Sequence, residues 1–155
     1  MNLLLVRHAQ AVGVGAVKQD IDRGLTRRGR ELMAQMAGVL VDENIVPKRI
    51  LVSPAQRACE TVQQLLSVIG PVEVEEIPAL YQASAMTILE VIHRHGGGAD
   101  PLMVVGHNPG LETTVSNIAG NLVPFPTGAI AHAVIEANSP SVVVAVWRPD
   151  ELPAV

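Results

Sequence analysis

The chain has 155 residues, of which 48% are hydrophobic and 17% are charged, and its formal net charge at pH 7 is -4. This length fits one globular domain over residues 1–155, with a core large enough to fold without disulfides or a structural metal. The negative net charge gives no electrostatic indication of a nucleic-acid partner, and the single Trp, single Tyr and single Phe are too few for a base-stacking surface, so we expect no nucleic-acid partner.

The start of the chain carries none of the signals that direct export or membrane insertion. Met1 and Asn2 lead directly into a short apolar run that lacks the basic region and the length of a signal peptide. No other apolar stretch approaches the roughly 20 residues that cross a bilayer. The single cysteine, Cys59, excludes an intrachain disulfide and suits a reducing compartment. We therefore expect a cytoplasmic protein with no membrane partner.

Short runs of Leu, Ile and Val predict four strands, at residues 2–6, 49–52, 102–105 and 142–147. These runs are apolar at consecutive positions, which is typical of strands that are covered on both faces.

Segments with helical spacing alternate with these strands. Apolar residues recur at steps of three and four after Thr26, which is the expected N-cap of the first helix. Pro54 is the expected first residue of the second helix, because proline suits that position. The predicted helices cover residues 26–41, 54–67, 85–95 and 110–119.

The remaining stretches predict turns and loops. Gly- and Pro-rich segments at 70–79 and 120–128 indicate loops, and the glycines at 96–98 indicate a helix end. Strand alternating with helix predicts an α/β fold, a three-layer α/β/α sandwich around a mostly parallel central sheet.

Three of the four predicted strands end on residue types that handle phosphate. Arg7 and His8 follow the first strand, Ser53 and Arg57 follow the second, and His107 and Asn108 follow the third. In open α/β sheets, ligands bind outside the carboxyl ends of the strands, where such residues converge. Arginine offers a planar fork of donors to phosphoryl oxygens, and histidine serves as nucleophile, acid or donor near pH 7. The sequence therefore predicts an anion site with a candidate nucleophile.

These residues resemble the motifs of the histidine phosphatase superfamily, which has the phosphoglycerate mutase-like fold. The stretch RHA at 7–9 is similar to its RHG signature, and LTRRG at 25–29 resembles the LTxxG that follows it. SPAQRACET at 53–61 is similar to SxxxRAxxT, and VVGHNPG at 104–110 resembles the second-histidine motif. The match spans about residues 2 to 135. The short length, GHNPG and TGAIA at 127–131 most resemble the small SixA-type phosphohistidine phosphatases.

The resemblance implies a role for each residue that matches a motif. His8 would be the nucleophile, which attacks phosphorus and forms a phosphohistidine intermediate that water then cleaves. Arg7, Arg57 and His107 would surround the transferred phosphoryl group and neutralise its charge. This chemistry requires no metal and no other cofactor.

Three further residues are candidate substrate-binding residues in the same site. Ser53 and Asn108 would orient the groups beside them, and Thr127 would contact the phosphoryl group or the leaving group. Tyr81 and Phe125 lie in predicted loops, and we expect them at the mouth of the crevice.

The chain departs from the family pattern where a proton donor is usual. Ala9 replaces the glycine after the first histidine, and PALYQASAM at 78–86 contains no carboxylate. Gln10 stands where short relatives often have an acidic residue, and an amide cannot donate a catalytic proton. Asp20 and Asp22 are the nearest candidates for a general acid, although loop aspartates are usually solvated or capping. The sequence therefore predicts weak acid catalysis.

Weak acid catalysis favours one kind of substrate. A phosphate ester leaves as a basic alkoxide that needs a proton, whereas a phosphohistidine leaves as an imidazole. We therefore expect a phosphohistidine phosphatase that acts on a phosphorylated protein. A small-molecule phosphomonoesterase of the same superfamily is the alternative, favoured if Asp20 or Asp22 lies within hydrogen-bonding reach of the phosphoryl site. A non-catalytic phosphate-binding or protein-docking module is a third hypothesis.

Overall fold

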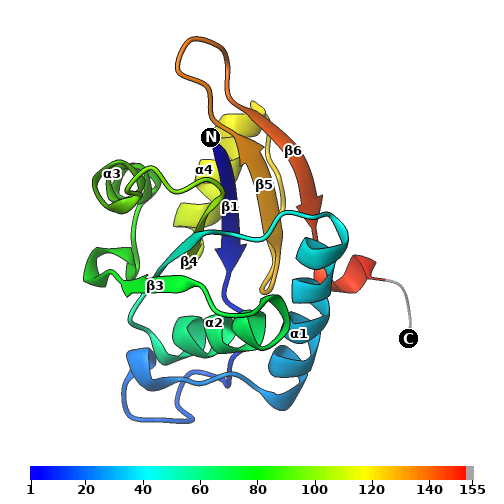
Figure 1. Cartoon of the computed structure of the whole chain (residues 1–155). Helices are drawn as coiled ribbons and strands as arrows, with labels where there is room; N and C mark the ends of the chain where they lie inside the picture. The colour runs from blue at the N-terminus through cyan, green and yellow to red at the C-terminus, as the bar shows by residue number, and fades with distance from the viewer. Residues whose placement is uncertain (153–155) are drawn as a thin grey trace.

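One six-stranded sheet forms the centre of the computed structural model, which describes residues 1–152 (Figure 1). The spatial order of the strands is β3-β2-β4-β1-β5-β6. The four strands from β3 to β1 run parallel, and β5 and β6 add to the sheet in antiparallel orientation. The strands are β1 (Asn2–Arg7), β2 (Arg49–Val52), β3 (Glu73–Glu76), β4 (Leu102–Gly106), β5 (Ile130–Val134) and β6 (Val142–Trp147).

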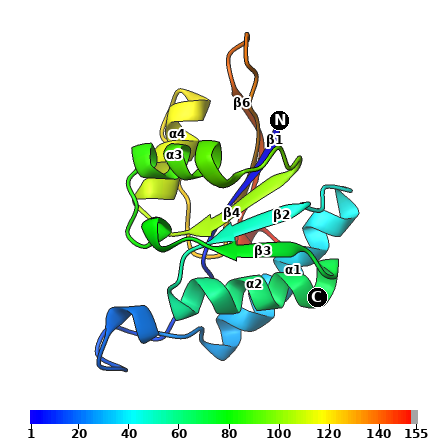
Figure 2. The same ribbon diagram turned by 60° about the vertical axis from the view of Figure 1, so that its left-hand side comes forward.

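Helices cover both faces of this sheet. Figure 2 shows α1 and α2 on one face and α3 and α4 on the other. The structure thus has three layers, as the alternation of strands and helices predicts. The helices are α1 (Arg27–Asp42), α2 (Gln56–Ile69), α3 (Ala85–His95) and α4 (Gly110–Ala119), with short 3-10 helices η1 (Asp20–Asp22), η2 (Pro78–Leu80) and η3 (Pro149–Glu151). Within residues 1–152, none of the helices is both long enough and apolar enough to span a membrane.

The first strand explains why its sequence is apolar at consecutive positions. Leu4 and Val6 pack in the core beneath α1 and α2, whereas Leu3 and Leu5 pack in the core beneath α3 and α4. Successive side chains of a strand point to opposite faces, and here both faces are buried. The strand is therefore held centrally, and its carboxyl end is fixed where Arg7 and His8 follow.

Most predicted elements agree with the structure. The strands at 49–52 and 142–147 and the helices at 85–95 and 110–119 have the predicted bounds. The first helix begins after Thr26, whose hydroxyl oxygen accepts the backbone N–H of Gly29 at 2.9 Å, as an N-cap does.

Two strands were not predicted. The segment 70–79, expected as a loop, contains β3, an exposed edge strand whose sequence EVEE lacks an apolar signal. The strand β5 has the sequence IAHAV, with two alanines and a histidine, and forms because it pairs with β1 about 130 residues earlier in the chain. In both cases a partner strand decides the conformation, which propensity along the sequence does not reveal.

Two details of the predicted elements are wrong. The second helix starts at Gln56 rather than at Pro54, because Pro54 and Ala55 form a bend in which Ser53 Oγ accepts the Ala55 N–H at 3.2 Å. The strand at 142–147 is not covered on both faces. It lies at the edge of the sheet, and Val144 is 55% exposed.

Candidate active site

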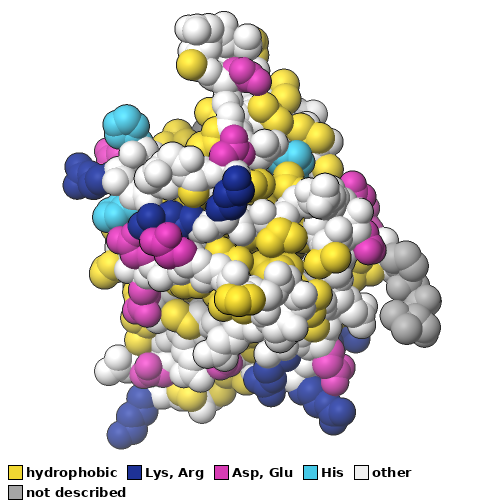
Figure 3. All heavy atoms as spheres, in the orientation of Figure 1, with side chains coloured by type: hydrophobic (Ala, Val, Ile, Leu, Met, Phe, Trp, Pro, Cys, Tyr) yellow, Lys and Arg dark blue, Asp and Glu magenta, His cyan; other side chains and the backbone are white. Residues whose placement is uncertain are grey.

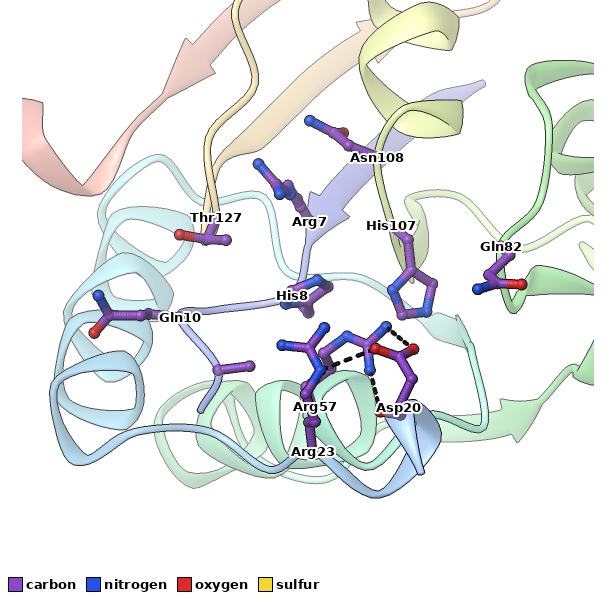
Figure 4. Close-up of a pocket in the computed structure, with 11 residues that line it drawn as sticks. Arg7, His8, Gln10, Asp20, Arg23, Arg57, Gln82, His107, Asn108 and Thr127 are labelled. Carbon is purple, nitrogen blue, oxygen red and sulfur yellow. Dashed lines mark hydrogen bonds and ion pairs between the residues drawn. The ribbon is translucent and has the colours of Figure 1, made fainter. Parts of the chain in front are cut away.

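A pocket of about 370 Å³ opens at the carboxyl ends of the central strands (Figure 4). Because β1 and β4 are parallel neighbours, the residues that follow them meet at one edge of the sheet. Six of the predicted site residues line this pocket, namely Arg7, His8, Arg57, His107, Asn108 and Thr127. Segments that are far apart in the sequence thus converge as the strand-end pattern predicts.

Backbone hydrogen bonds fix the segment that carries His8. The N–H of His8 donates to the carbonyl of Gly106 at 3.0 Å, which ties the end of β1 to the end of β4. The N–H of Ala9 donates to Thr61 Oγ1 at 2.9 Å, and the Thr61 hydroxyl donates to the carbonyl of Arg57 at 2.7 Å. Buried Thr61 therefore connects the histidine segment to the helix that carries Arg57.

The contacts of His8 define its charge and its tautomer. Burial, together with the positive charges of Arg57 and Arg7, lowers the pKa of His8 to about 3, so the ring is neutral near pH 7. Nδ1 lies 2.8 Å from the carbonyl oxygen of Ala9, and a carbonyl only accepts, so Nδ1 carries the single proton. Nε2 then keeps its lone pair, which is the state that a nucleophilic imidazole requires.

His107 packs against His8 with the two ring centroids 5.2 Å apart. Burial and the charge of Arg57 lower the pKa of His107 to about 4, so this ring is also neutral near pH 7. Its Nε2 lies 2.7 Å from Ser53 Oγ. Ser53 Oγ accepts the N–H of Ala55, and in one of the two neutral tautomers of His107 the Ser53 hydroxyl donates to Nε2. In this arrangement Nδ1 of His107 carries the ring proton and is a donor.

The arginines hold the two sides of the pocket. Arg57 donates from Nη1 to the backbone carbonyl of Asp20 at 2.8 Å and from Nη2 to its carboxylate at 3.0 Å. Arg7 donates from Nη1 to the carbonyl of Phe125 at 3.1 Å, and the amide of Asn108 donates to the same oxygen at 2.8 Å. Asn108 therefore positions the loop that Arg7 contacts.

Several donors of these residues have no acceptor in the protein. Nε of Arg7, Nε of Arg57 and Nδ1 of His107 are buried without a hydrogen-bond partner among residues 1–152. Buried polar groups in native proteins are nearly always paired, and unpaired ones call for an explanation such as a functional role. All three belong to residues that line the pocket, whereas a fourth such nitrogen, Nε of Arg49, belongs to a residue that does not. Two arginines and a histidine around one pocket fit a ligand rich in acceptor oxygens, as a phosphoryl group is.

Loops form the outer wall of the pocket. Asp20 accepts hydrogen bonds from Arg23 at 2.9 Å, from Tyr81 at 2.5 Å and from Arg57. The Tyr81 hydroxyl, with Arg23 and Arg57, holds the pKa of the Asp20 carboxyl well below its usual range, so this group is a carboxylate near pH 7. Figure 4 shows Asp20 beside Arg57, and it shows Gln82 on the side of His107 that faces away from His8.

The structure separates the sequence-based candidates by position. Ser53 is fully buried and does not line the pocket, but it contacts His107. Phe125, expected at the mouth, is 1% exposed and packs in the core. Tyr81 does lie near the mouth, where its ring meets that of His107 edge-on at 5.7 Å.

Sequence reasoning missed three residues. Arg23 and Gln82 line the pocket from irregular segments that no strand-end pattern marks. Gln82 has a φ of +54°, an uncommon conformation for a residue other than glycine, and no local sequence signal predicts it. Thr61 belongs to the quoted SxxxRAxxT motif, so its position was available as a signal.

The described residues include no group of three or more His, Cys, Asp or Glu side chains placed to hold a metal ion. Asp22, the second candidate for a general acid, is exposed and does not line the pocket.

Comparison with known proteins agrees with this geometry. The family model of the histidine phosphatase superfamily (branch 1) matches residues 3–88. A crystal structure assigned as the phosphohistidine phosphatase SixA of Agrobacterium tumefaciens is 26% identical, with a TM-score of 0.85 over 96% of this chain and 97% of that one. The protein histidine phosphatase SixA, complexed with tungstate, is 23% identical, with a TM-score of 0.87 over 99% of this chain and all of the other.

One curated relative also matches in sequence. An uncharacterized chloroplastic protein of Arabidopsis thaliana is 27% identical over 135 residues, which are 81% of this chain. The match spans 62% of the length of that relative.

The fold is thus the phosphoglycerate mutase-like α/β sandwich, and the pocket is that of a phosphate-handling enzyme. The chain belongs to branch 1 of the histidine phosphatase superfamily.

Proposed function

We propose that the protein removes the phosphoryl group from phosphohistidine in a protein substrate and that His8 is the nucleophile. The observation that carries this proposal is the state of His8. Its ring is neutral, its Nδ1 is tied to the Ala9 carbonyl, and Arg7, Arg57 and His107 line the same pocket. The resemblance to SixA proteins supports the choice of substrate.

The reaction proceeds in two displacements. Nε2 of His8 attacks phosphorus, and the bond from phosphorus to the leaving nitrogen breaks with its electron pair going to that nitrogen. When the substrate ring carries a proton on its other nitrogen, it leaves as neutral imidazole. Water then attacks the phosphorylated His8, the product departs as dihydrogen phosphate with both water protons, and His8 returns to its neutral state.

Arg7, Arg57 and His107 stabilise the charge of the transferred group. Their unpartnered nitrogens donate to equatorial oxygens, which is the electrostatic work that dominates phosphoryl transfer. Ser53 is a positioning residue that holds His107 in the donor tautomer, and Asn108 positions Arg7 through the carbonyl of Phe125.

Thr127 lines the pocket on the side away from Asp20 and Gln82 (Figure 4), and there its hydroxyl contacts the phosphoryl group or the leaving group. Its loop is held against the end of β1, because the N–H of Gly128 donates to the carbonyl of His8 at 3.0 Å.

The state of Asp20 supports phosphohistidine over an alcohol ester. An alkoxide leaving group needs a proton in the transition state, and a carboxylate with a lowered pKa has none to give near pH 7. Gln10, which lines the pocket, has an amide side chain that cannot supply the proton either. A neutral imidazole leaves without such help.

A direct comparison of substrates tests the proposal. Free phosphohistidine and a phosphohistidine-bearing protein, prepared with phosphoramidate, are offered beside phosphoserine and p-nitrophenyl phosphate. We expect kcat/KM to be higher for both phosphohistidine substrates and to vanish for all substrates in His8→Ala. Preference for the esters, or activity that survives in His8→Ala, would contradict the proposal.

A small-molecule phosphomonoesterase is the second candidate, because Asp20 does line the pocket and contacts Arg57. Asp20 would then have to gain a proton when substrate binds and donate it to the leaving alkoxide. The variant Asp20→Asn distinguishes the two functions. Ester hydrolysis that falls by about a hundredfold or more would favour the esterase, since general acid catalysis contributes that much. Phosphohistidine hydrolysis that changes by less than about tenfold would favour the phosphohistidine phosphatase.

A further inference from the structure

The first 30 residues, which supply six of the residues that line the pocket, differ in charge from the rest of the chain. Residues 1–30 contain six of the 11 Lys and Arg residues and two of the 15 Asp and Glu residues, a formal charge of +4, whereas residues 31–155 carry -8. An acidic chain therefore has a positive segment beside its active site. Such a separation of charge steers anionic ligands towards that site.

Apart from Arg7, which is one of the predicted catalytic residues, this positive segment has five basic side chains, and we call these five the basic rim. The basic rim consists of Lys18, Arg23, Arg27, Arg28 and Arg30. Arg23 lines the pocket, and the other four are exposed. In Figure 3, Lys and Arg side chains project from the lower end of the molecule, where Figure 1 shows the loop before α1 and the first turn of α1.

Hydrogen bonds join the basic rim to the pocket. The N–H of Thr26, the N-cap of α1, donates to the backbone carbonyl of Gln10 at 3.0 Å, and its hydroxyl donates to Gln10 Oε1 at 2.9 Å. Gln10 itself lines the pocket. The first turn of α1, which carries three of the arginines, therefore begins next to a residue of the pocket wall.

Acidic neighbours neutralise the basic rim only in part. Arg27 and Glu31 form an ion pair at 2.9 Å, but their side chains are 89% and 60% exposed, and exposed pairs of this kind contribute little. Arg30 lies 4.0 Å from Glu60, at the limit of an ion pair. Arg23 is the exception, because its ion pair with Asp20 is largely shielded on the arginine side.

The two remaining members have no acidic partner. Lys18 and Arg28 make no ion pair with any of residues 1–152. Asp20, the acidic residue nearest to Lys18 in the sequence, is already paired with Arg23 and Arg57, and the next one, Asp22, is exposed. The charges of Lys18 and Arg28 are therefore available to a ligand from solution.

The placement of the arginines also opposes the stability of the helix. The positive end of a helix dipole lies at its N-terminus and favours Asp or Glu in the first turn. The first turn of α1 has no acidic residue and carries Arg27, Arg28 and Arg30 instead. Arg27 and Arg30 have polar contacts within the chain, with Glu31 and with the carbonyl of Leu25, but Arg28 has none among residues 1–152, and a local rule broken without a compensating contact indicates a functional reason.

We propose that the basic rim is a docking surface for acidic residues that flank the phosphorylated histidine of a protein substrate. This inference rests on the proposed function, because the phosphohistidine must enter the pocket while its neighbours contact the basic rim. Continuity between the rim and the pocket, through Arg23 and Gln10, favours a flanking peptide over a separate ligand. The attraction acts through exposed charges, so it weakens as ionic strength rises.

Three phosphohistidine peptides of equal length test this surface, with Glu, Ser or Lys at the positions that flank the histidine. At low salt we expect kcat/KM to decrease from Glu to Ser to Lys, with at least about a tenfold difference between the first and the last. The difference should shrink towards the Ser value in about 0.5 M NaCl. Free phosphohistidine serves as the substrate without flanking residues.

Matched variants assign the effect to the basic rim. Lys18→Glu/Arg28→Glu is expected to abolish or invert the preference and to leave the hydrolysis of free phosphohistidine unchanged. The control Lys48→Glu/Arg94→Glu changes the net charge by the same amount at exposed positions, one just before β2 and one in the last turn of α3. It is expected to keep the preference for Glu flanks.

Three results would overturn the inference, and each has a different reading. Equal kcat/KM for all three peptides, or a preference that persists in the rim variant, would show that the rim does not contact the substrate. Binding of phosphatidylserine vesicles or RNA that the rim variant loses, without any flank preference, would assign the surface to another partner. A protein that hydrolyses none of the phosphohistidine substrates, free or in peptides, would overturn the proposed function and this inference together.

Discussion

The pocket has a deep wall and an outer wall, and the two differ in how they are held. The deep wall consists of Arg7, His8 and His107, which follow buried central strands and are tied together by backbone hydrogen bonds. The outer wall consists of Asp20, Tyr81 and Gln82, which lie on segments without long helices or strands. Chemistry needs fixed geometry and recognition needs variable surface, so we assign phosphoryl transfer to the deep wall and substrate choice to the outer one.

The sharpest way to break this division is to remove the nucleophile. His8→Ala is expected to lower kcat for phosphohistidine by about 10⁴-fold or more, because the covalent route is lost. The control His93→Ala changes an exposed histidine of α3 and should leave kcat unchanged. Initial rates with free phosphohistidine measure both. A His8→Ala enzyme with more than a few per cent of normal activity would move the chemistry away from the deep wall.

A smaller effect is expected behind the deep wall. Ser53→Ala removes the hydroxyl that holds Nε2 of His107, so kcat should fall by about tenfold, as for the loss of one hydrogen bond. Nitrogen NMR of the His107 ring should show a mixture of tautomers in place of one. Ser67→Ala, at an exposed hydroxyl on α2, is the control for both measurements. A single unchanged tautomer in Ser53→Ala would mean that Ser53 has only a packing role.

The outer wall should tolerate change better. Tyr81→Phe removes the hydroxyl that donates to Asp20, and an exposed hydrogen bond contributes about 0.5–1.5 kcal/mol. We expect kcat/KM for free phosphohistidine to change by less than about tenfold, and kcat to change less than KM. Steady-state kinetics checks this. A loss as large as that of His8→Ala would place Tyr81 with the catalytic residues and end the distinction between the walls.

The sequence predicted all of the deep wall but only Asp20 and Tyr81 of the outer wall, for a physical reason. Arg7, His8 and His107 follow short apolar runs that are typical of buried strands, so their convergence follows from the parallel sheet. Arg23 and Gln82 reach the pocket from loops whose course depends on tertiary contacts, such as those of Asp20 with Arg57 and Tyr81. A pattern along the chain contains no signal for such contacts.

The same contrast applies to the fold. The strand at residues 3–6 could be predicted because all of its side chains are apolar, and they are apolar because each is buried against one of the two cores. The edge strand β3 and the strand β5 depend on pairing with distant strands, and their sequences were not recognised as strands. Thr26 shows that local signals succeed where the contact is local, since its cap bond spans three residues.

The last expected effect concerns stability and pH rather than catalysis. The pKa values of His8 and His107 are about 3 and about 4 in the folded protein, below the value of 6.5 for an unperturbed histidine. Between pH 6.5 and pH 4 the unfolded chain therefore binds more protons, and the free energy of unfolding decreases as the pH falls through this window. Carboxylates with lowered pKa values, such as Asp20, keep their charge there and do not contribute.

Urea denaturation at two pH values measures this effect. The midpoint should be lower at about pH 5 than at about pH 7.5, and His8→Gln should lose part of the difference, whereas His93→Gln should keep it. Equal midpoints for the normal protein would contradict the burial of two neutral histidines in the deep wall.

The state of His8 during turnover tests the central claim most directly. The protein is mixed with a phosphohistidine-bearing protein, quenched within milliseconds at alkaline pH, where phosphohistidine survives, and the mass of the peptide that contains His8 is measured. We expect this peptide to gain the mass of one phosphoryl group and to lose it as turnover ends. Turnover without any phosphoryl group on that peptide, or with the group on another residue, would contradict it.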